Sequence, residues 1–111
     1  MLLTTTNSLE GHKIKHYLGI VTGDTIIGAN IFKDIGASIR DIIGGRASAY
    51  ERVMDEGKKI AESELVQKAM AMGANAIIGI DFDYEVMGKG GSMLMVSMTG
   101  TAVIIDEALY V

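Results

Sequence analysis

Three carboxylates recur at every second position in one short stretch of this chain, namely Asp81, Asp83 and Glu85. In a β-strand, residues two apart lie on the same face about 6.6 Å from each other, so two neighbouring carboxylates could reach one ion. Carboxylate oxygens are the ligands that hard cations such as Mg²⁺, Mn²⁺ and Ca²⁺ prefer. The row therefore predicts a metal site, with a divalent metal ion as the cofactor that it would hold.

Two other interpretations of this carboxylate row stay open. The row could be the solvated face of the strand, opposed by Ser97 and Thr99 on the partner strand of a hairpin. It could also serve an enzyme at a subunit interface, because a shared low-dielectric pocket would separate the pKa values of Asp81 and Asp83. Nucleophilic catalysis has little support, since the chain has no cysteine and no serine in a G-x-S-x-G motif.

A second candidate site lies where a long helical pattern is expected to begin, at Gly44, Gly45, Arg46 and Ser48. Free backbone N–H groups at a helix N-terminus favour anions, and an arginine can add a bidentate contact to phosphate or carboxylate. This pattern predicts an anion or ligand site. The alternative is that the glycines only separate two helices and that Arg46 forms a structural ion pair.

The two histidines, His12 and His16, are four residues apart. They fall in an expected turn and strand, where this spacing separates them by about 13 Å. Two histidines cannot complete a tetrahedral metal site in one subunit, although copies near a symmetry axis could. The alternative is that both are solvated beside Lys13 and Lys15.

Composition excludes several classes of protein. Of the 111 residues, 49% are hydrophobic and 22% charged, which excludes an intrinsically disordered chain. A net charge of −4 argues against nucleic acid as a partner. No apolar run is long enough to span a bilayer, and the first residues do not resemble a secretory signal. We therefore expect a cytoplasmic protein without membrane partners.

Hydrophobic periodicity assigns the elements that must position these residues. Alternating patterns indicate strands, and apolar residues three and four apart indicate helices. In chain order we expect a β-prone opening at 2–6, a strand at 14–22 that resumes at 25–27 after a turn or bulge at Gly23-Asp24, a helix at 32–43 ended by Gly44-Gly45, a helix from Ala49 to about Met72, and strands at 76–86 and 93–105 joined by a turn at 88–92.

The long helix has clear expected ends and a clear expected core face. Ser48 and Glu51 have the spacing of an N-terminal capping box, and Gly73 is a candidate C-terminal glycine. The core face should carry Val53, Gly57, Ile60, Ala61, Leu65, Ala69 and Met72. In the strand at 76–86, strict alternation places Ile78, Ile80, Phe82, Tyr84 and Val86 opposite a face with Ile77, Gly79, Asp81, Asp83 and Glu85.

These elements predict one α+β domain at 1–105, with a short tail at 106–111. One long helix would cover one face of a small antiparallel sheet. The chain has no proline, a residue that often protects strand edges, so its strand edges are open to pairing. A small, hydrophobic domain with open edges should bury more surface by associating with copies of itself, so we expect a closed homo-oligomer.

Several long motifs in this order resemble the YbjQ-like family. They include Thr22-Gly23-Asp24, the stretch from Gly28 to Asp34, the stretch from Ile39 to Arg46, the stretch from Gly73 to Glu85, and Gly91-Ser92-Met93-Leu94-Met95. The resemblance covers residues 2–105. It implies a β-α-β-β subunit, similar to the dodecin-like arrangement, in a homopentameric ring. The family is uncharacterised and often labelled heavy-metal-binding, and it supplies no catalytic residue. We therefore expect the partner to be the chain itself, as a pentamer or a decamer of two stacked rings.

Overall fold

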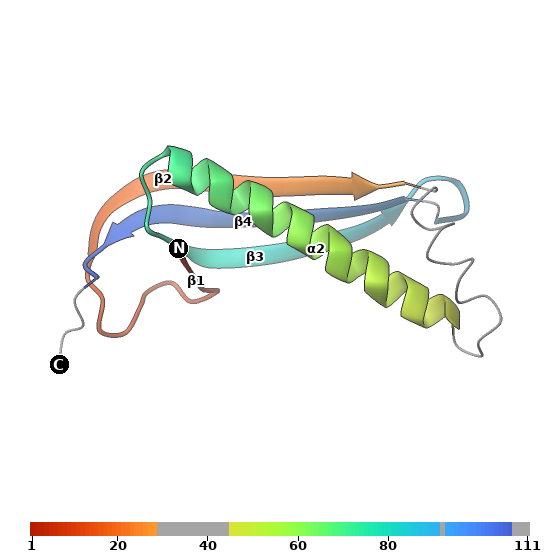
Figure 1. Cartoon of the computed structure of the whole chain (residues 1–111), viewed down its shortest axis with the longest axis horizontal. Helices are drawn as coiled ribbons and strands as arrows, with labels where there is room; N and C mark the ends of the chain where they lie inside the picture. The colour runs from red at the N-terminus through yellow and green to blue at the C-terminus, as the bar shows by residue number, and fades with distance from the viewer. Residues whose placement is uncertain (29–44, 92, 108–111) are drawn as a thin grey trace.

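The structure is a computed structural model that describes residues 1–28, 45–91 and 93–107, with residues 45–50 and 90 described by backbone alone. Helix α2 (Gly45–Ala71) crosses one face of a four-stranded sheet of order β1-β3-β4-β2 (Figure 1). The strands are β1 (Leu2–Leu3), β2 (Ile14–Ile27), β3 (Ala76–Met87) and β4 (Met93–Ile105). The predicted α+β class is confirmed. The helix expected at 32–43 lies outside the described residues.

The sheet is mixed, so the prediction of a wholly antiparallel sheet was wrong at one edge. Strands β3 and β4 form the predicted antiparallel hairpin, joined through the short 3₁₀ turn η1 (Lys89–Gly91), and β2 pairs antiparallel with β4. Strand β1 instead runs parallel to β3. Because β1 and β3 are far apart in sequence, no tight turn between them imposes an antiparallel direction.

Strand β2 is continuous through Gly23-Asp24, where a turn or bulge was predicted. Gly23 is needed there for a different reason: a Cβ atom would collide with the backbone of Ala61 and Leu65 in α2. The irregularities in the pairing of β2 with β4 lie earlier, between Ile14 and His16 and between Tyr17 and Gly19. Glycine at position 23 therefore brings the helix close to the sheet and does not bend the strand.

The core face of α2 is narrower than predicted. Five predicted positions at a spacing of four residues are buried, namely Val53, Gly57, Ala61, Leu65 and Ala69. Ile60 and Met72 were assigned to this face wrongly, since each is 39% exposed. Ile60 is about 100° around the helix from Ala61, and Met72 lies beyond the last helical residue.

No helix among the described residues is both long and apolar enough to cross a membrane.

The two ends of α2 differ in how well the sequence indicates them. The helix begins at Gly45, so Ser48 lies inside the first turn and the predicted capping box does not mark the start. The predicted glycine end is confirmed. Gly73 has a φ of 87° and donates to the carbonyl of Met70 at 3.0 Å, while Ala74 donates to the carbonyl of Ala69 at 3.0 Å. This is the hydrogen-bond pattern of a Schellman motif, which satisfies the last carbonyls of the helix.

A bulge at Gly79 reverses the alternation of β3. Ile78 pairs with Thr101 and Asp81 pairs with Thr99, so two residues of β3 oppose Gly100 alone. Gly79 has a φ of 61°, a left-handed conformation that suits glycine at a bulge. The strict alternation predicted for β3 was therefore wrong, because the carboxylate row shares its face with Ile78 and not with Ile77.

Two apolar clusters lie on opposite faces of the sheet. The larger cluster lies between α2 and the sheet and includes Leu65, Ile77, Ile80, Val96 and Met98. The smaller one contains Ala76, Ile78, Val103 and Ile105, with Leu9 and Ile14 packed against it. The segment between β1 and β2 thus covers only one end of the face opposite the helix, and we call the remainder the open face.

Candidate functional site

The carboxylate row lies on the open face, across from hydroxyl groups on β4. Asp81 pairs with Thr99, and Asp83 pairs with Ser97, which is the cross-strand arrangement predicted from the sequence. The same β4 residues pair on their other side with Thr22 and Asp24 of β2. We call this set the polar stripe: Thr22, Asp24, Asp81, Asp83, Glu85, Ser97 and Thr99. The bulge at Gly79 is what aims its three β3 carboxylates away from the helix.

Within the polar stripe, one hydrogen bond fixes a carboxylate that the sequence interpretation did not select. Ser97 Oγ donates to Asp24 Oδ1 at 2.6 Å, across strands β4 and β2. Asp24 is on the open face because it is opposite Ser97, which the sequence alone could not show while Gly23-Asp24 was interpreted as a turn. A fourth carboxylate therefore accompanies the predicted three.

The polar stripe does not form a metal cage within one chain. Same-face neighbours on β3 are about 6.6 Å apart, and Asp24 is two strands from Asp83, a separation of about 9.5 Å. In the described part of the chain, no group of three or more histidine, cysteine, aspartate or glutamate side chains could hold a metal ion. One chain presents the carboxylates in a row, and the metal site at Asp81, Asp83 and Glu85 stays a prediction.

The exposure of these carboxylates bears on the enzyme hypothesis. Asp81, Asp83 and Glu85 are all exposed in the single chain. The acid–base interpretation needs a shared pocket of low dielectric, and the described residues of one chain do not enclose one around them. A second subunit would have to complete such a pocket, so the catalytic interpretation of Asp81 and Asp83 stays a prediction.

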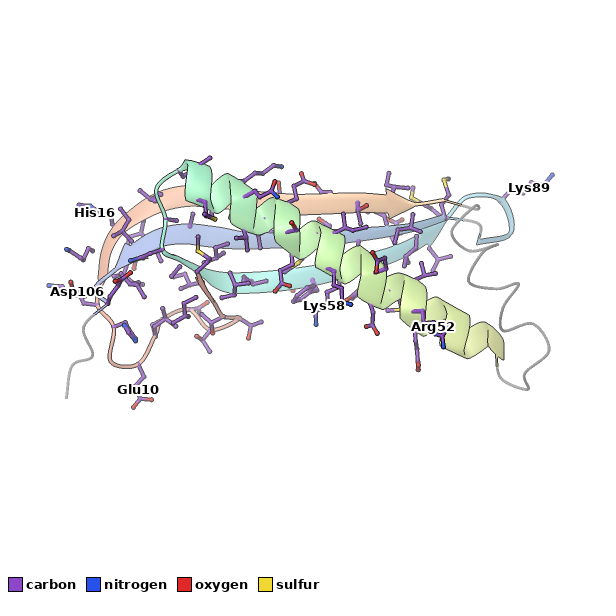
Figure 2. All side chains as sticks on the ribbon, in the orientation of Figure 1. Glu10, His16, Arg52, Lys58, Lys89 and Asp106 are labelled. Atoms are coloured by element: carbon purple, nitrogen blue, oxygen red, sulfur yellow. The ribbon has the colours of Figure 1, made fainter. Side chains whose placement is uncertain are left out.

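The two histidines lie apart, and one of them has a structural contact. Part-buried His12 donates from Nδ1 to the backbone carbonyl of Asp106 at 2.8 Å, which joins the loop before β2 to the end of β4. His16 is exposed on β2, at the same end of the molecule as Asp106 (Figure 2). The turn and strand positions expected for the pair are confirmed.

The predicted anion site is described only in part. Gly44 lies outside the described residues, and Gly45, Arg46 and Ser48 form the first turn of α2 in the backbone. The anion hypothesis needs a helix that begins near these residues, and α2 does begin at Gly45. The side chains of Arg46 and Ser48 are not described, so the anion site stays a prediction.

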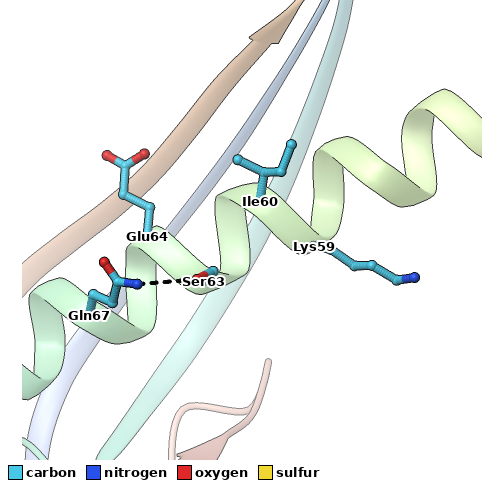
Figure 3. Close-up of a pocket in the computed structure, with 5 residues that line it drawn as sticks. All are labelled: Lys59, Ile60, Ser63, Glu64 and Gln67. Carbon is cyan, nitrogen blue, oxygen red and sulfur yellow. Dashed lines mark hydrogen bonds between the residues drawn. The ribbon is translucent and has the colours of Figure 1, made fainter. Parts of the chain in front are cut away.

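Hollows on the surface of α2 lack the groups from several elements that converge in an active site. One is lined by Lys59, Ile60, Ser63, Glu64 and Gln67, all from the helix, with Gln67 Nε2 donating to Ser63 Oγ at 3.4 Å (Figure 3). Two others are also lined by α2 alone. Since a single helix supplies every described lining group, no opposing wall from the described residues is present to orient a substrate.

One hollow of about 200 Å³ joins four parts of the fold and was not predicted. It lies between the N-terminal segment, α2, β3 and β4, with Ile80, Phe82 and Met98 among its lining residues. The Lys58 Nζ atom stands 5.2 Å from the centre of the Phe82 ring, a cation–π contact. No sequence pattern indicates this hollow, because it depends on where β1 joins the sheet.

A family model described as "Putative heavy-metal-binding" matches residues 1–106. The chain belongs to this YbjQ-like family. The resemblance found in the motifs is confirmed over nearly the same range. A crystal structure of a DUF74-family protein of unknown function from Pediococcus pentosaceus ATCC 25745 is similar, with a TM-score of 0.53 and 23% identity. The match covers 96% of this chain and 98% of that one, and at this identity it shows a shared fold.

Proposed function

We propose that this protein is a subunit of a homopentameric, dodecin-like ring that binds a divalent metal ion or a small ligand where neighbouring subunits meet. The observation that supports the proposal is the polar stripe, with its three exposed carboxylates on the open face. The heavy-metal-binding description of the family agrees with a role in ion binding. We infer no catalytic activity, and a cytoplasmic location and the stacking of rings into a decamer stay predictions.

The donor atoms favour a hard cation. The chain has no cysteine, and its histidines lie apart from the polar stripe, so the stripe offers only carboxylate and hydroxyl oxygens. Mg²⁺, Mn²⁺ and Ca²⁺ prefer such oxygens, whereas soft heavy metals prefer thiolate or imidazole. Two adjacent carboxylates of one row can reach one ion. Because these two side chains supply only part of the ion's coordination, groups from a second subunit would complete it.

Titration calorimetry tests the metal hypothesis. Chelator-treated protein is titrated with MgCl₂, MnCl₂, CaCl₂ and ZnCl₂ separately, and we expect heat of binding from one of the hard cations. The variant Asp81→Asn/Asp83→Asn should abolish that heat. The matched control, Asp55→Asn/Glu56→Gln, removes two exposed carboxylates from α2 and should leave it unchanged. Heat that survives in the first variant, or no heat from any ion, would contradict the proposal.

Native mass spectrometry tests the ring. We expect a single species of five subunits at micromolar concentration, because the open face and the unpaired strand edges of the described residues leave apolar surface that association can bury. A stable one-subunit mass under these conditions would rule the ring out.

A further inference from the structure

Three methionines lie together at the end of the sheet nearest the turn η1. Met87, the last residue of β3, pairs directly with Met93, the first residue of β4, and Met95 follows two positions later. Directly opposite side chains start about 5 Å apart, and same-face neighbours on one strand about 6.6 Å apart. We call these three residues the methionine cluster. Figure 2 shows sulfur atoms near this end of the sheet, where Lys89 is labelled.

The methionine cluster lies on the open face. Residues at the start of β4 alternate between buried positions under α2 and half-buried positions on the other side, and Met93 and Met95 belong to the half-buried set with Ser97. Met87 shares their face because directly paired residues of neighbouring strands lie on the same side of a sheet. All three methionines are half-buried, so a small ion can reach them, whereas Met98 is sealed in the core.

The described surroundings of the cluster suit a cation. Met95 pairs with Ile26 on β2 and with Glu85 on β3, so one neighbour is apolar and the other is acidic. The negative charge of Glu85 favours a positive ion nearby. Lys89, the basic residue of the turn, extends away from the sheet (Figure 2). A cation at the cluster therefore gains from Glu85 without facing the Lys89 ammonium.

We propose that the methionine cluster binds one soft monovalent cation, Cu(I) or Ag(I), through its three thioether sulfurs. Thioether sulfur is a soft ligand that selects Cu(I), whereas Mg²⁺ and Ca²⁺ prefer oxygen. Methionine has three rotatable bonds, so sulfurs from opposite and adjacent strand positions can turn toward one point. Because Cu(I) and Ag(I) accept few ligands, the three sulfurs of one chain form a complete site.

This site goes beyond the proposed function and does not depend on the ring. The polar stripe offers carboxylate and hydroxyl oxygens to a hard divalent ion, and the cluster offers sulfur to a soft monovalent one. Glu85 remains part of the polar stripe and contributes charge to the cluster, not a ligand. Two classes of metal ion should therefore bind to separate parts of the same face.

Native mass spectrometry with silver nitrate in chloride-free ammonium acetate tests the site. We expect one Ag(I) per subunit at equimolar addition. Met93→Leu/Met95→Leu should lose this adduct, because leucine keeps the apolar bulk and removes the sulfur. The matched control, Met70→Leu/Met72→Leu, replaces two exposed methionines outside the cluster and should keep it. Circular dichroism checks that each variant is folded.

A second measurement locates the bound ion. In protein labelled with ¹³C at the methionine methyl groups, the signals of Met87, Met93 and Met95 should shift together and reach their end point at one equivalent of Ag(I). The signal of buried Met98 should not move. The single variant Met87→Leu, on the other strand, should also weaken the binding of Ag(I), because the site then keeps two sulfurs.

The outcomes separate this site from the proposed function. Asp81→Asn/Asp83→Asn should keep the Ag(I) adduct, and Met93→Leu/Met95→Leu should keep the heat of binding of the hard cation. No adduct in the wild-type protein, or an adduct that persists in the methionine variant, would overturn the inference. A methionine-dependent adduct in a protein that gives no heat with any hard cation would contradict the proposed function and support this inference.

Discussion

The two faces of the sheet differ in how closely other parts of the chain pack against them. On the helix side, glycines at 23, 57 and 100 lie so close to neighbouring atoms that a Cβ at any of them would overlap one. On the open face, polar and apolar side chains lie in rows across β2, β4 and β3, and no element of the described residues covers most of their length. We infer that the first face holds the chain folded and that the second is available for binding.

The largest effect should come from filling the closest approach on the helix side. Gly23→Ala places a Cβ against the backbone of Ala61 and Leu65, which cannot move as a side chain can, so we expect a loss of about 3 kcal/mol or more in the free energy of unfolding. Urea denaturation at fixed protein concentration measures this. Gly28→Ala is the matched control, since nothing lies within 4 Å of its added Cβ, and it should change stability little.

Two methionines on one strand compare the faces directly. Met98 is 1% exposed under α2, whereas Met95 is half-buried on the open face. Met98→Ala should cost about 3 kcal/mol through lost burial and a cavity, and Met95→Ala less than about 1 kcal/mol. Equal losses in thermal or urea unfolding would show that the open face is as tightly packed as the helix side.

The smallest effects should come from two polar contacts of β4, one at its last residue and one within the strand. Asn75 holds the backbone of Ile105 with two hydrogen bonds of 2.8 and 2.9 Å in a part-buried position, so Asn75→Ala should cost about 2 kcal/mol. Ser97→Ala loses one exposed bond to Asp24 and should cost about 0.5 kcal/mol. The reverse order in unfolding experiments would mean that the polar stripe is a structural network and not a solvated binding surface.

Local patterns predicted the elements well where neighbours in sequence decide them. The buried stripe from Val53 to Ala69 follows from helical spacing, and the end at Gly73 follows from the need for a left-handed residue. Sequence patterns failed where contacts with segments distant in sequence determine the local structure. The parallel direction of β1, the role of Gly23 and the bulge at Gly79 each depend on which strand or helix lies alongside.

For the candidate site, the sequence placed Asp81, Asp83 and Glu85 together and opposite Ser97 and Thr99, and the strand pairing confirms this arrangement. It did not indicate Asp24, because that residue joins the polar stripe through the register of β2 and not through its neighbours in sequence. In the proposed ring, a second copy would complete the coordination of an ion, and no pattern within one chain specifies that contact.

Gly79 has a consequence for how this strand can change in evolution. Because two residues of β3 oppose Gly100, every later side chain of β3 lies on the face opposite to the one that strict alternation would give it. Loss of one of these two residues would turn the three carboxylates toward the helix side and would turn Phe82, which packs against the helix-side cluster, toward the open face. Point changes on the open face should therefore cost little folding stability, whereas a one-residue deletion in the same stretch should cost much more.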